Sequence, residues 1–453
     1  MNCLVPVALR WPAHGLCRSR APHRQMRRTG PTRREVLRDI GAVAGAVGGV
    51  AVAGRARAAD DRWPTLGHGP GRDGYAAGNE GPSDALGPAW TVGTGAATTA
   101  PAVVDGTVYA GSLDGNCYAV AAADGTRKWT ADVGPVGGDP TVSDGTVYVG
   151  SRERGVVALD AAAGAERWRH EVPAGVDASP TVVDGAVYVG GLDGTVYALD
   201  AATGEPAWTH TTDDEVSAAP AVAGDTVYVG GWDDRLRALD AATGDPRWTV
   251  GTGAAVTAAP AVTEDTVYVG GSDRSTGDPQ NWRLYALDAA DGTERWAVGT
   301  ETAVRAPPAV AAGTVYVGSG PSVVALAADD GTREWTFEAD ARVTTAPVVA
   351  GSTVYAGTRR TGMYALNAGT GRELAAFDPG GPLAPADRGT TSRGNAPAVA
   401  GGRLYLGTVD GRLYALDERS ATDGTTPWGV VGGGVVALVG GGAWLWRRRG
   451  TTK

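Results

Sequence analysis

The chain has 453 residues, including 70 Gly and 27 Pro, and 43% of its residues are hydrophobic. This disfavours a long all-helical fold, because an interior helical Gly costs about 1 kcal/mol relative to Ala, yet the apolar content suffices for a large core. Cys3, Cys17 and Cys117 are too few for a disulfide scaffold or a cysteine-based zinc site. The net charge is −10, with 25 basic against 48 acidic residues between positions 60 and 446, which argues against a nucleic-acid partner.

The acidic composition suggests a protein adapted to concentrated salt. Lys128 and Lys453 are the two lysines of the chain, so arginine supplies nearly all of its positive charge. Repulsion between surface carboxylates is screened over roughly 3 Å at 1 M salt. We therefore hypothesise a halophilic source and expect the protein to lose structure on dialysis into low salt.

Residues 1–59 are predicted to be an N-terminal extension with a twin-arginine signal peptide. Arg33 and Arg34 precede a small-residue apolar run from residue 40 to 53, and Ala56-Arg57-Ala58 resembles a cleavage site. An amphipathic basic helix is the alternative interpretation. Met26 is the expected true start of translation. A lead-in segment, residues 60–87, follows the signal.

Residues 88–417 consist of one unit repeated eight times. Each unit contains a Tyr in the frame Thr-Val-Tyr-Val-Gly or a close variant, at Tyr109, Tyr148, Tyr188, Tyr228, Tyr268, Tyr316, Tyr355 and Tyr405. Within a unit, four short alternating runs are separated by Gly/Asp and Thr-Gly turns, which predicts a four-stranded antiparallel meander. Such units with a period of about 40 residues predict an all-β, eight-bladed propeller.

The register of the tryptophans predicts how the ring closes. Six units end in a Trp, namely Trp129, Trp168, Trp208, Trp248, Trp296 and Trp335. Phe377 stands near the equivalent place in the seventh unit, and the eighth stops after Asp417. Trp90 precedes the first unit, so we expect it to supply the outer strand of the last blade and remove the exposed edges. An open solenoid would instead need polar capping repeats, which the sequence lacks.

These tryptophans belong to a motif that resembles a known family. The stretch from Ala198 to Trp208 is similar to the tryptophan-docking motif A-x-D-x-x-T-G-x-x-x-W of the quinoprotein (PQQ) repeat family, and Ala238 to Trp248 matches it equally well. The opening Trp63-Pro64 resembles the lead-in of secreted members. The resemblance covers about residues 63–417 and implies an eight-bladed propeller in which Trp90 and the six unit-ending tryptophans pack between blades. It does not imply an enzyme.

The C-terminal region is predicted to anchor the protein. After a linker, residues 418–427, the 19 uncharged residues 428–446 could form a helix of roughly 28 Å, close to the hydrocarbon thickness of a bilayer. The arginines that begin the tail, residues 447–453, should stay cytoplasmic. The alternative is a Gly-rich tail lying on the surface.

Departures from the repeat indicate a candidate binding site at one mouth of the ring. Most units place Ser, Thr, Ala or Gly where the chain enters the innermost strand, and the exceptions are polar or charged. Two longer segments, around residues 274–282 and 378–396, fall on the same face. The predicted ligand-binding residues at this channel mouth are Asp139, Asp177, Arg305, Arg393, Asn395, Trp232 and Trp282. Solvated loop variation is the alternative. If the site is functional, Arg305 and Arg393 should attract an anionic group.

No catalytic residue and no metal ligand is predicted. Vicinal cysteines, which family members that are quinone-dependent alcohol dehydrogenases pair above their cofactor, are absent. Repeated Asp-Gly pairs, such as Asp114-Gly115 and Asp193-Gly194, are read as hairpin turns rather than calcium loops. No cofactor is therefore predicted, although PQQ with calcium would accompany the enzymatic alternative.

Together these features predict an exported, single-pass membrane protein whose propeller lies outside the cytoplasm. We expect a non-catalytic binding or scaffolding module with a protein partner at the cell surface and no nucleic-acid partner. The alternatives are a PQQ-dependent dehydrogenase of alcohols or sugars and a structural or adhesive surface protein.

Overall fold

A computed structural model describes residues 62–76, 78–271, 282–359, 362–380, 383 and 396–418. The chain divides into two compact units, Met1–Ala56 and Arg57–Lys453, and every described residue belongs to the second. The predicted signal peptide, most of the linker and the predicted anchor, residues 428–446, lie outside the described part. Within the described part, no helix has the length and apolar character needed to cross a membrane.

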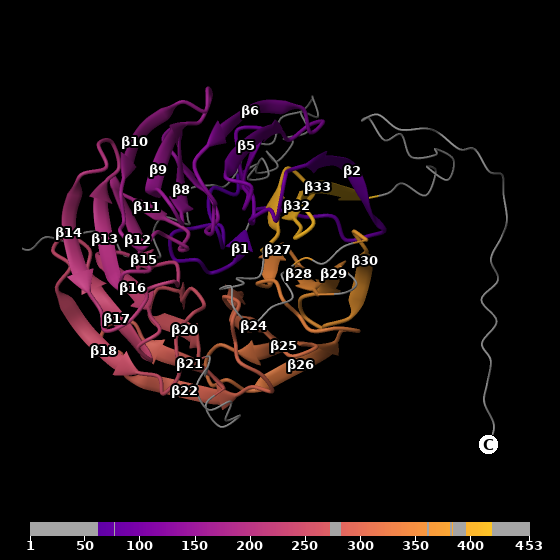
Figure 1. Cartoon of the computed structure of the whole chain (residues 1–453). Coiled ribbons are helices and arrows are strands. Elements are labelled where there is room, and N and C mark those ends of the chain that lie inside the picture. Colours follow the sequence, from indigo (N-terminus) through magenta and orange to yellow (C-terminus); the bar gives the residue numbers. More distant parts are fainter. Residues whose placement is uncertain are drawn as a thin grey trace, which may run out of the picture. The chain divides into compact units, whose positions relative to one another are not determined.

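The described residues form eight sheets arranged as the blades of a ring, and the four strands of each blade are antiparallel to their neighbours (Figure 1). Seven sheets have four strands and one has five. The first strand of each blade contacts the first strand of neighbouring blades, as in the pairs β3 with β7 and β11 with β15, so first strands are innermost. The prediction of an all-β, eight-bladed propeller is confirmed.

The blades follow the order of the chain. From the centre outward, blades 1 to 4 are β3 (Ala102–Val104), β4 (Thr107–Gly111), β5 (Asn116–Ala121), β6 (Arg127–Asp132); β7 (Thr141–Ser143), β8 (Thr146–Ser151), β9 (Gly155–Asp160), β10 (Glu166–His170); β11 (Thr181–Val183), β12 (Ala186–Gly190), β13 (Thr195–Asp200), β14 (Pro206–Thr211); β15 (Ala221–Ala223), β16 (Thr226–Gly230), β17 (Arg235–Asp240), β18 (Pro246–Gly251). Blades 5 to 7 are β19 (Ala261–Val262), β20 (Thr266–Gly270), β21 (Arg283–Asp288), β22 (Glu294–Gly299); β23 (Ala309–Ala311), β24 (Thr314–Ser319), β25 (Ser322–Ala327), β26 (Arg333–Glu338); β27 (Val348–Ala350), β28 (Thr353–Thr358), β29 (Gly362–Asn367), β30 (Glu373–Phe377). Blade 8 is β31 (Ala398–Ala400), β32 (Arg403–Gly407), β33 (Arg412–Glu418) and, from the other end of the repeat region, β2 (Leu86–Gly93).

Local sequence explains these strands and turns. The second strand of a blade, such as β16, is mostly apolar and is buried along its whole length. The turn after the first strand often contains Asp-Gly in the left-handed conformation, with φ of 48° at Asp105 and 68° at Gly106. Left-handed residues at both central positions suit a tight hairpin. The pair Asp114-Gly115 also forms a turn, since the Asp114 carboxylate accepts the backbone N–H of Asn116 at 2.9 Å.

The ring closes as the sequence predicts. Strand β2 pairs antiparallel with β33, and Trp90 lies opposite Ala415. The indole N–H of Trp90 donates to the carbonyl of Ala122 in blade 1 at 2.9 Å. The N-terminal strand thus joins the last blade to the first.

The same contact recurs at seven of the eight blade boundaries. Each Trp donates its indole N–H to an Ala carbonyl of the next blade, as Trp208 does to Ala241 at 2.9 Å. The ring of the Trp lies on a glycine in the turn that contains the acceptor Ala. In this example, a Cβ added to Gly244 would come within 2.6 Å of the Trp208 ring. The equivalent pairs of rings and glycines are Trp90 and Gly125, Trp129 and Gly164, Trp168 and Gly204, Trp248 and Gly292, Trp296 and Gly331, and Trp335 and Gly371. That these contacts hold the blades together remains a prediction.

The boundary between blades 7 and 8 is built differently. The residue of β30 that lies opposite the third strand, where other blades have Trp, is Ala375, which pairs with Ala365. Phe377, placed near this position by the sequence analysis, instead packs edge-on against Tyr414 at 5.7 Å between ring centroids. The Tyr355 hydroxyl donates to the carbonyl of Pro82 at 2.9 Å. The lead-in chain therefore fills the boundary that has no Trp.

Residues 62–76 and 78–83 of the lead-in form a strap along the inside of the ring, near β1 (Tyr75–Ala76) in Figure 1. Equivalent valines on the innermost strands of six blades donate their backbone N–H groups to strap carbonyls at 2.6–2.9 Å: Val103 to Trp63, Val142 to Pro64, Val222 to Pro70, Val262 to Gly71, Val310 to Asp73 and Val349 to Gly74. Side chains of the strap reach the other two blades. Arg72 donates a hydrogen bond to blade 3, and Asn79 donates one to blade 8. The strap contacts all eight blades.

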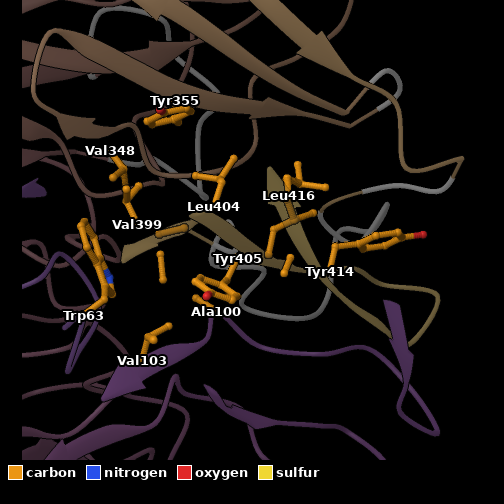
Figure 2. Close-up of a cluster of buried hydrophobic side chains, with 14 of the residues drawn as sticks. Trp63, Ala100, Val103, Val348, Tyr355, Val399, Leu404, Tyr405, Tyr414 and Leu416 are labelled. Carbon is orange, nitrogen blue, oxygen red and sulfur yellow. The ribbon is translucent and has the colours of Figure 1, made fainter. Parts of the chain in front are cut away.

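Strap side chains also belong to the core. Trp63 is 1% exposed and lies among the innermost strands of blades 1 and 8, beside Val103 and Val399 (Figure 2). Arg72 is equally buried, and its guanidinium donates to the Thr181 hydroxyl at 2.6 Å and to the carbonyl of Pro220 at 2.8 Å. The strap therefore fills space near the axis of the ring and also accepts hydrogen bonds from the innermost strands.

Candidate functional site

The predicted site lies on the mouth face, which we define as the face carrying the turns between second and third strands and the connections into the innermost strands. The other two sets of turns lie on the opposite face, as the antiparallel meander requires. Five of the seven predicted site residues are described by the structure. Arg393 and Asn395 lie outside the described residues, as do most residues of the two longer segments on this face.

Asp139 of blade 2 is a buried residue that joins three blades. Its side chain is largely covered, at 7% exposure, and its carboxylate accepts the backbone N–H of Ala100 in blade 1 at 2.8 Å. The other carboxylate oxygen accepts the hydroxyl of Ser179 in blade 3 at 3.1 Å. These contacts give Asp139 a structural role at the mouth, and binding of a ligand by this residue remains a prediction.

Asp177 of blade 3 is buried in an ion pair. Arg152, from the turn between β8 and β9 in blade 2, donates to both carboxylate oxygens of Asp177, at 2.5 and 3.2 Å. A Cβ added to Gly137 would clash with the Asp177 carboxylate, so the small residue in blade 2 makes room for this pair. The charge of the Asp177 carboxylate is therefore neutralised by Arg152 of the neighbouring blade.

Arg305 and Trp282 come from blades 6 and 5. Arg305 is exposed where the chain enters the innermost strand of blade 6. Trp282 is half-buried at the start of β21, and its indole N–H has no hydrogen-bond acceptor among the described residues. The structure places both on the mouth face, in different blades from Asp139 and Asp177.

Trp232 is held on the mouth face by the turn of blade 4. Its indole N–H donates to the Ser217 hydroxyl at 3.1 Å, and its backbone N–H donates to the carbonyl of Glu215 at 3.0 Å. The next residue, Asp233, forms an ion pair with Arg237 of β17, and the two side chains are only 4% and 7% exposed. Burial opposes ionisation of Asp233, but the Arg237 guanidinium outweighs it and the pKa of Asp233 is lowered.

The charge of Arg237 also affects His210 near the end of β14 in blade 3. Burial, reinforced by the positive charge of Arg237, lowers the pKa of the His210 imidazole. The neutral form of His210 is therefore favoured at neutral pH. The blade 4 turn thus combines the partly exposed indole of Trp232 with the buried ion pair between Asp233 and Arg237.

The sequence analysis missed a set of apolar side chains at the mouth. The position of Trp232 is occupied in other blades by Leu113, Leu192 and Val409, each followed by an Asp. Leu113 is 38% exposed, and Leu192 and Val409 are half-buried. The Asp carboxylate accepts a backbone N–H group within the turn, as at Asp114 and Asp193. The turn does not require an apolar residue before the Asp. The repeated pair of an apolar residue and Asp was the available signal.

The described residues contain no group of three or more His, Cys, Asp or Glu side chains placed to hold a metal ion. Cavities of about 400 and 740 Å³ flank the strap at His68 and Pro70 on the opposite face. On the mouth face, the structure brings together apolar turn residues, buried ion pairs and exposed carboxylates.

Comparison with known families identifies the repeat. Residues 113–217, 192–277 and 280–421 match the family model for PQQ-type repeats described as "Outer membrane protein assembly factor BamB". These matches cover more than half of the chain. No curated protein matches the chain significantly.

Solved structures share the fold at low sequence identity. BamB from Moraxella catarrhalis is 24% identical, with a TM-score of 0.60 over 73% of this chain and 97% of that chain. Quinohemoprotein alcohol dehydrogenase from Comamonas testosteroni is 17% identical, with a TM-score of 0.66 over 82% of this chain and 83% of that chain. A europium-containing methanol dehydrogenase is 15% identical, with a TM-score of 0.65 over 80% and 99%. At these identities the likeness concerns the fold alone, which binding proteins and enzymes share.

Proposed function

Because the chain belongs to the PQQ-repeat family of the outer membrane protein assembly factor BamB, we propose that it is a non-catalytic module that binds or scaffolds a protein partner. The partner docks on the mouth face. The observation that carries this proposal is the set of apolar side chains at the turn tips, Leu113, Leu192, Trp232 and Val409. An aromatic side chain held in a fixed position, such as Trp232, is a typical anchor of a protein interface, and the aliphatic side chains around it exclude water.

We further propose that the propeller is exported by the twin-arginine route and tethered outside the cytoplasm by residues 428–446. The motif at Arg33 and Arg34 and the long uncharged C-terminal segment support this topology. Membrane anchoring would hold the ring close to a partner that is itself in or near the membrane. A halophilic source would fit the acidic composition.

A PQQ-dependent dehydrogenase is the second candidate, supported by the fold shared with the two dehydrogenases. Within the described residues the single cysteine, Cys117, is fully buried, and the chain has no vicinal cysteine pair. The residues predicted at the mouth, Asp139 and Asp177, are engaged by Ser179 and Arg152. These contacts favour the binding module.

Capture from membranes of the source organism, at its own salt concentration, tests the choice between the two. We expect the tagged full chain to retain a protein partner, and a variant with Leu113→Ser, Leu192→Ser, Trp232→Ser and Val409→Ser to lose it. A matched control carries four exposed substitutions on the opposite face, Asp124→Ser, Glu205→Ser, Asp245→Ser and Asp330→Ser. Dye reduction with alcohols that depends on added PQQ and calcium, together with equal capture by all three proteins, would favour the dehydrogenase.

A further inference from the structure

One acidic loop on the mouth face is enclosed by the turns of two neighbouring blades. The loop, residues 212–217, connects blade 3 to blade 4. The backbone N–H of Val216 donates to Gly191 in the blade 3 turn at 3.1 Å, and the N–H of Trp232 in the blade 4 turn donates to Glu215 of the loop at 3.0 Å. The turns that carry Leu192 and Trp232 therefore flank the loop, one on each side. We call residues 191–194, 212–217 and 231–237 the blade 3–4 platform.

The platform is strongly acidic. It contains six carboxylates against the guanidinium groups of Arg235 and Arg237. Asp214, Glu215 and Asp234 are exposed, and Asp213, which pairs with Arg235 at 2.8 Å, has 74% of its side chain exposed. The other two carboxylates are not exposed: Asp193 is half-buried, and the side chain of Asp233 is buried. The apolar side chains of the platform are thus bordered by negative charge in solvent.

The buried ion pair fixes the turn that presents Trp232. Arg237 donates to both oxygens of Asp233, and the backbone N–H of Asp213 in the acidic loop donates to the same carboxylate at 3.4 Å. Blades 1 and 3 have a tyrosine in place of Arg237, and the hydroxyl of Tyr197 donates to Asp193 at 2.6 Å. A buried ion pair contributes little net stability, because both charges must leave water. Its consequence here is to lock the turn and the loop together.

We propose that the blade 3–4 platform binds a cationic segment of the protein partner that also carries an apolar or aromatic side chain. The inference rests on the proposed function and adds the chemistry of the partner. The apolar side chain packs on Trp232 and Leu192, where an indole face also attracts a cation. Lysine or arginine side chains pair with Asp214 and Glu215. The net charge of the chain, −10, steers such a segment toward the ring.

This inference differs from the sequence-based expectation of an anionic ligand. That expectation depended on Arg305 and Arg393, and the structure describes only Arg305, in blade 6. Arg305 is one exposed cation, whereas the platform joins several exposed carboxylates to two apolar anchors. Charge complementarity at the platform therefore favours a cationic partner segment.

Peptide binding to the full chain tests the proposal. The probes are two fluorescein-labelled, amidated hexapeptides, one alternating Lys and Leu and the other alternating Glu and Leu, measured by anisotropy over a range of salt concentrations. We expect the Lys/Leu peptide to bind at least about tenfold more tightly than the Glu/Leu peptide, with affinity falling as salt rises. Trp232→Ala should weaken binding by about tenfold or more.

Charge variants separate the platform from general attraction to an acidic protein. Asp214→Lys with Glu215→Lys should abolish binding of the Lys/Leu peptide, whereas Glu205→Lys with Asp245→Lys, in the same blades but on the opposite face, should leave it nearly unchanged. Arg237→Tyr should retain binding, because a tyrosine hydroxyl can still hold Asp233 as Tyr197 holds Asp193. Arg237→Leu should weaken it, while circular dichroism confirms that both variants fold.

Two results would overturn the inference in distinguishable ways. Tighter binding of the Glu/Leu peptide, lost in Arg305→Glu, would keep the mouth face as the docking surface but reverse the chemistry of the partner. Equal loss of binding in the opposite-face variant would show that the attraction is not specific to the platform. Failure of the proposed function itself would appear separately, as capture of a partner from membranes that does not depend on the mouth face.

Discussion

A chain that begins at Asp84, and so lacks the strap, should melt at a temperature at least about 10 °C lower than a chain that begins at Asp60. The strap accepts backbone hydrogen bonds from six blades, and each such bond contributes roughly 1 kcal/mol. Removing it also exposes the space filled by Trp63, whose loss alone should cost about 3–5 kcal/mol. Without Pro82, Tyr355 loses its hydrogen-bond acceptor at the boundary that has no Trp.

The Cys117 thiol provides an independent reporter of this change. Burial raises the pKa of Cys117 to about 12, so the thiol should not react with a disulfide reagent at pH 8 while the ring is closed. We expect slow reaction in the chain from Asp60 and fast reaction in the chain from Asp84. A chain from Trp63, which loses only Asp60, Asp61 and the exposed Arg62, serves as the control. Equal melting temperatures and equal thiol reaction rates in all three chains would show that the strap does not stabilise the ring.

A substitution at the Trp–glycine contact should destabilise the ring more than the same substitution at a matched glycine. Gly204 and Gly185, both in blade 3, have φ of 77° and 79°, so Ala at either site pays the same left-handed backbone penalty of about 1–2 kcal/mol. A Cβ at Gly204 would come within 2.5 Å of the Trp168 ring, while a Cβ at Gly185 meets nothing within 4 Å. Gly204→Ala should therefore cost about 1–3 kcal/mol more than Gly185→Ala.

Urea unfolding of the two variants measures this difference directly. Because backbone strain is common to both, the difference in unfolding free energy isolates the packing of the indole between blades 2 and 3. The indole N–H of Trp168 also donates to Ala201 at 2.9 Å, and displacing the ring would break that bond. Equal destabilisation would mean that the Trp contacts are incidental to the ring.

Regular repetition made the architecture predictable. Eight tyrosines in one frame define the blades, and the spare Trp90 predicts the closing strand, which the pairing of β2 with β33 confirms. At the seventh blade the signal was weaker, because Phe377 lies two residues from the position that the strand register equates with Trp. Ala375 occupies that position, and an alanine gives no sign that another segment must fill the gap.

The strap could not be predicted because its contacts carry little sequence information. Its ring of hydrogen bonds uses backbone carbonyls, which every residue has, and its conformation follows no strand or helix period. The mouth was only partly predictable for a related reason. The sequence shows that Asp139 and Asp177 depart from the repeat, but not that Ser179 and Arg152 engage their carboxylates across blade boundaries.

Site-specific photocrosslinking in membranes of the source organism tests most directly whether the mouth face is the docking surface. A photoreactive phenylalanine analogue would replace Leu113, Leu192 or Val409 on the mouth face, and Asp124, Glu205 or Asp330 on the opposite face. The account predicts one protein crosslinked from the mouth positions, displaced by excess unmodified chain, and none from the opposite face. Crosslinks from the opposite face alone, or equally from both faces, would contradict it.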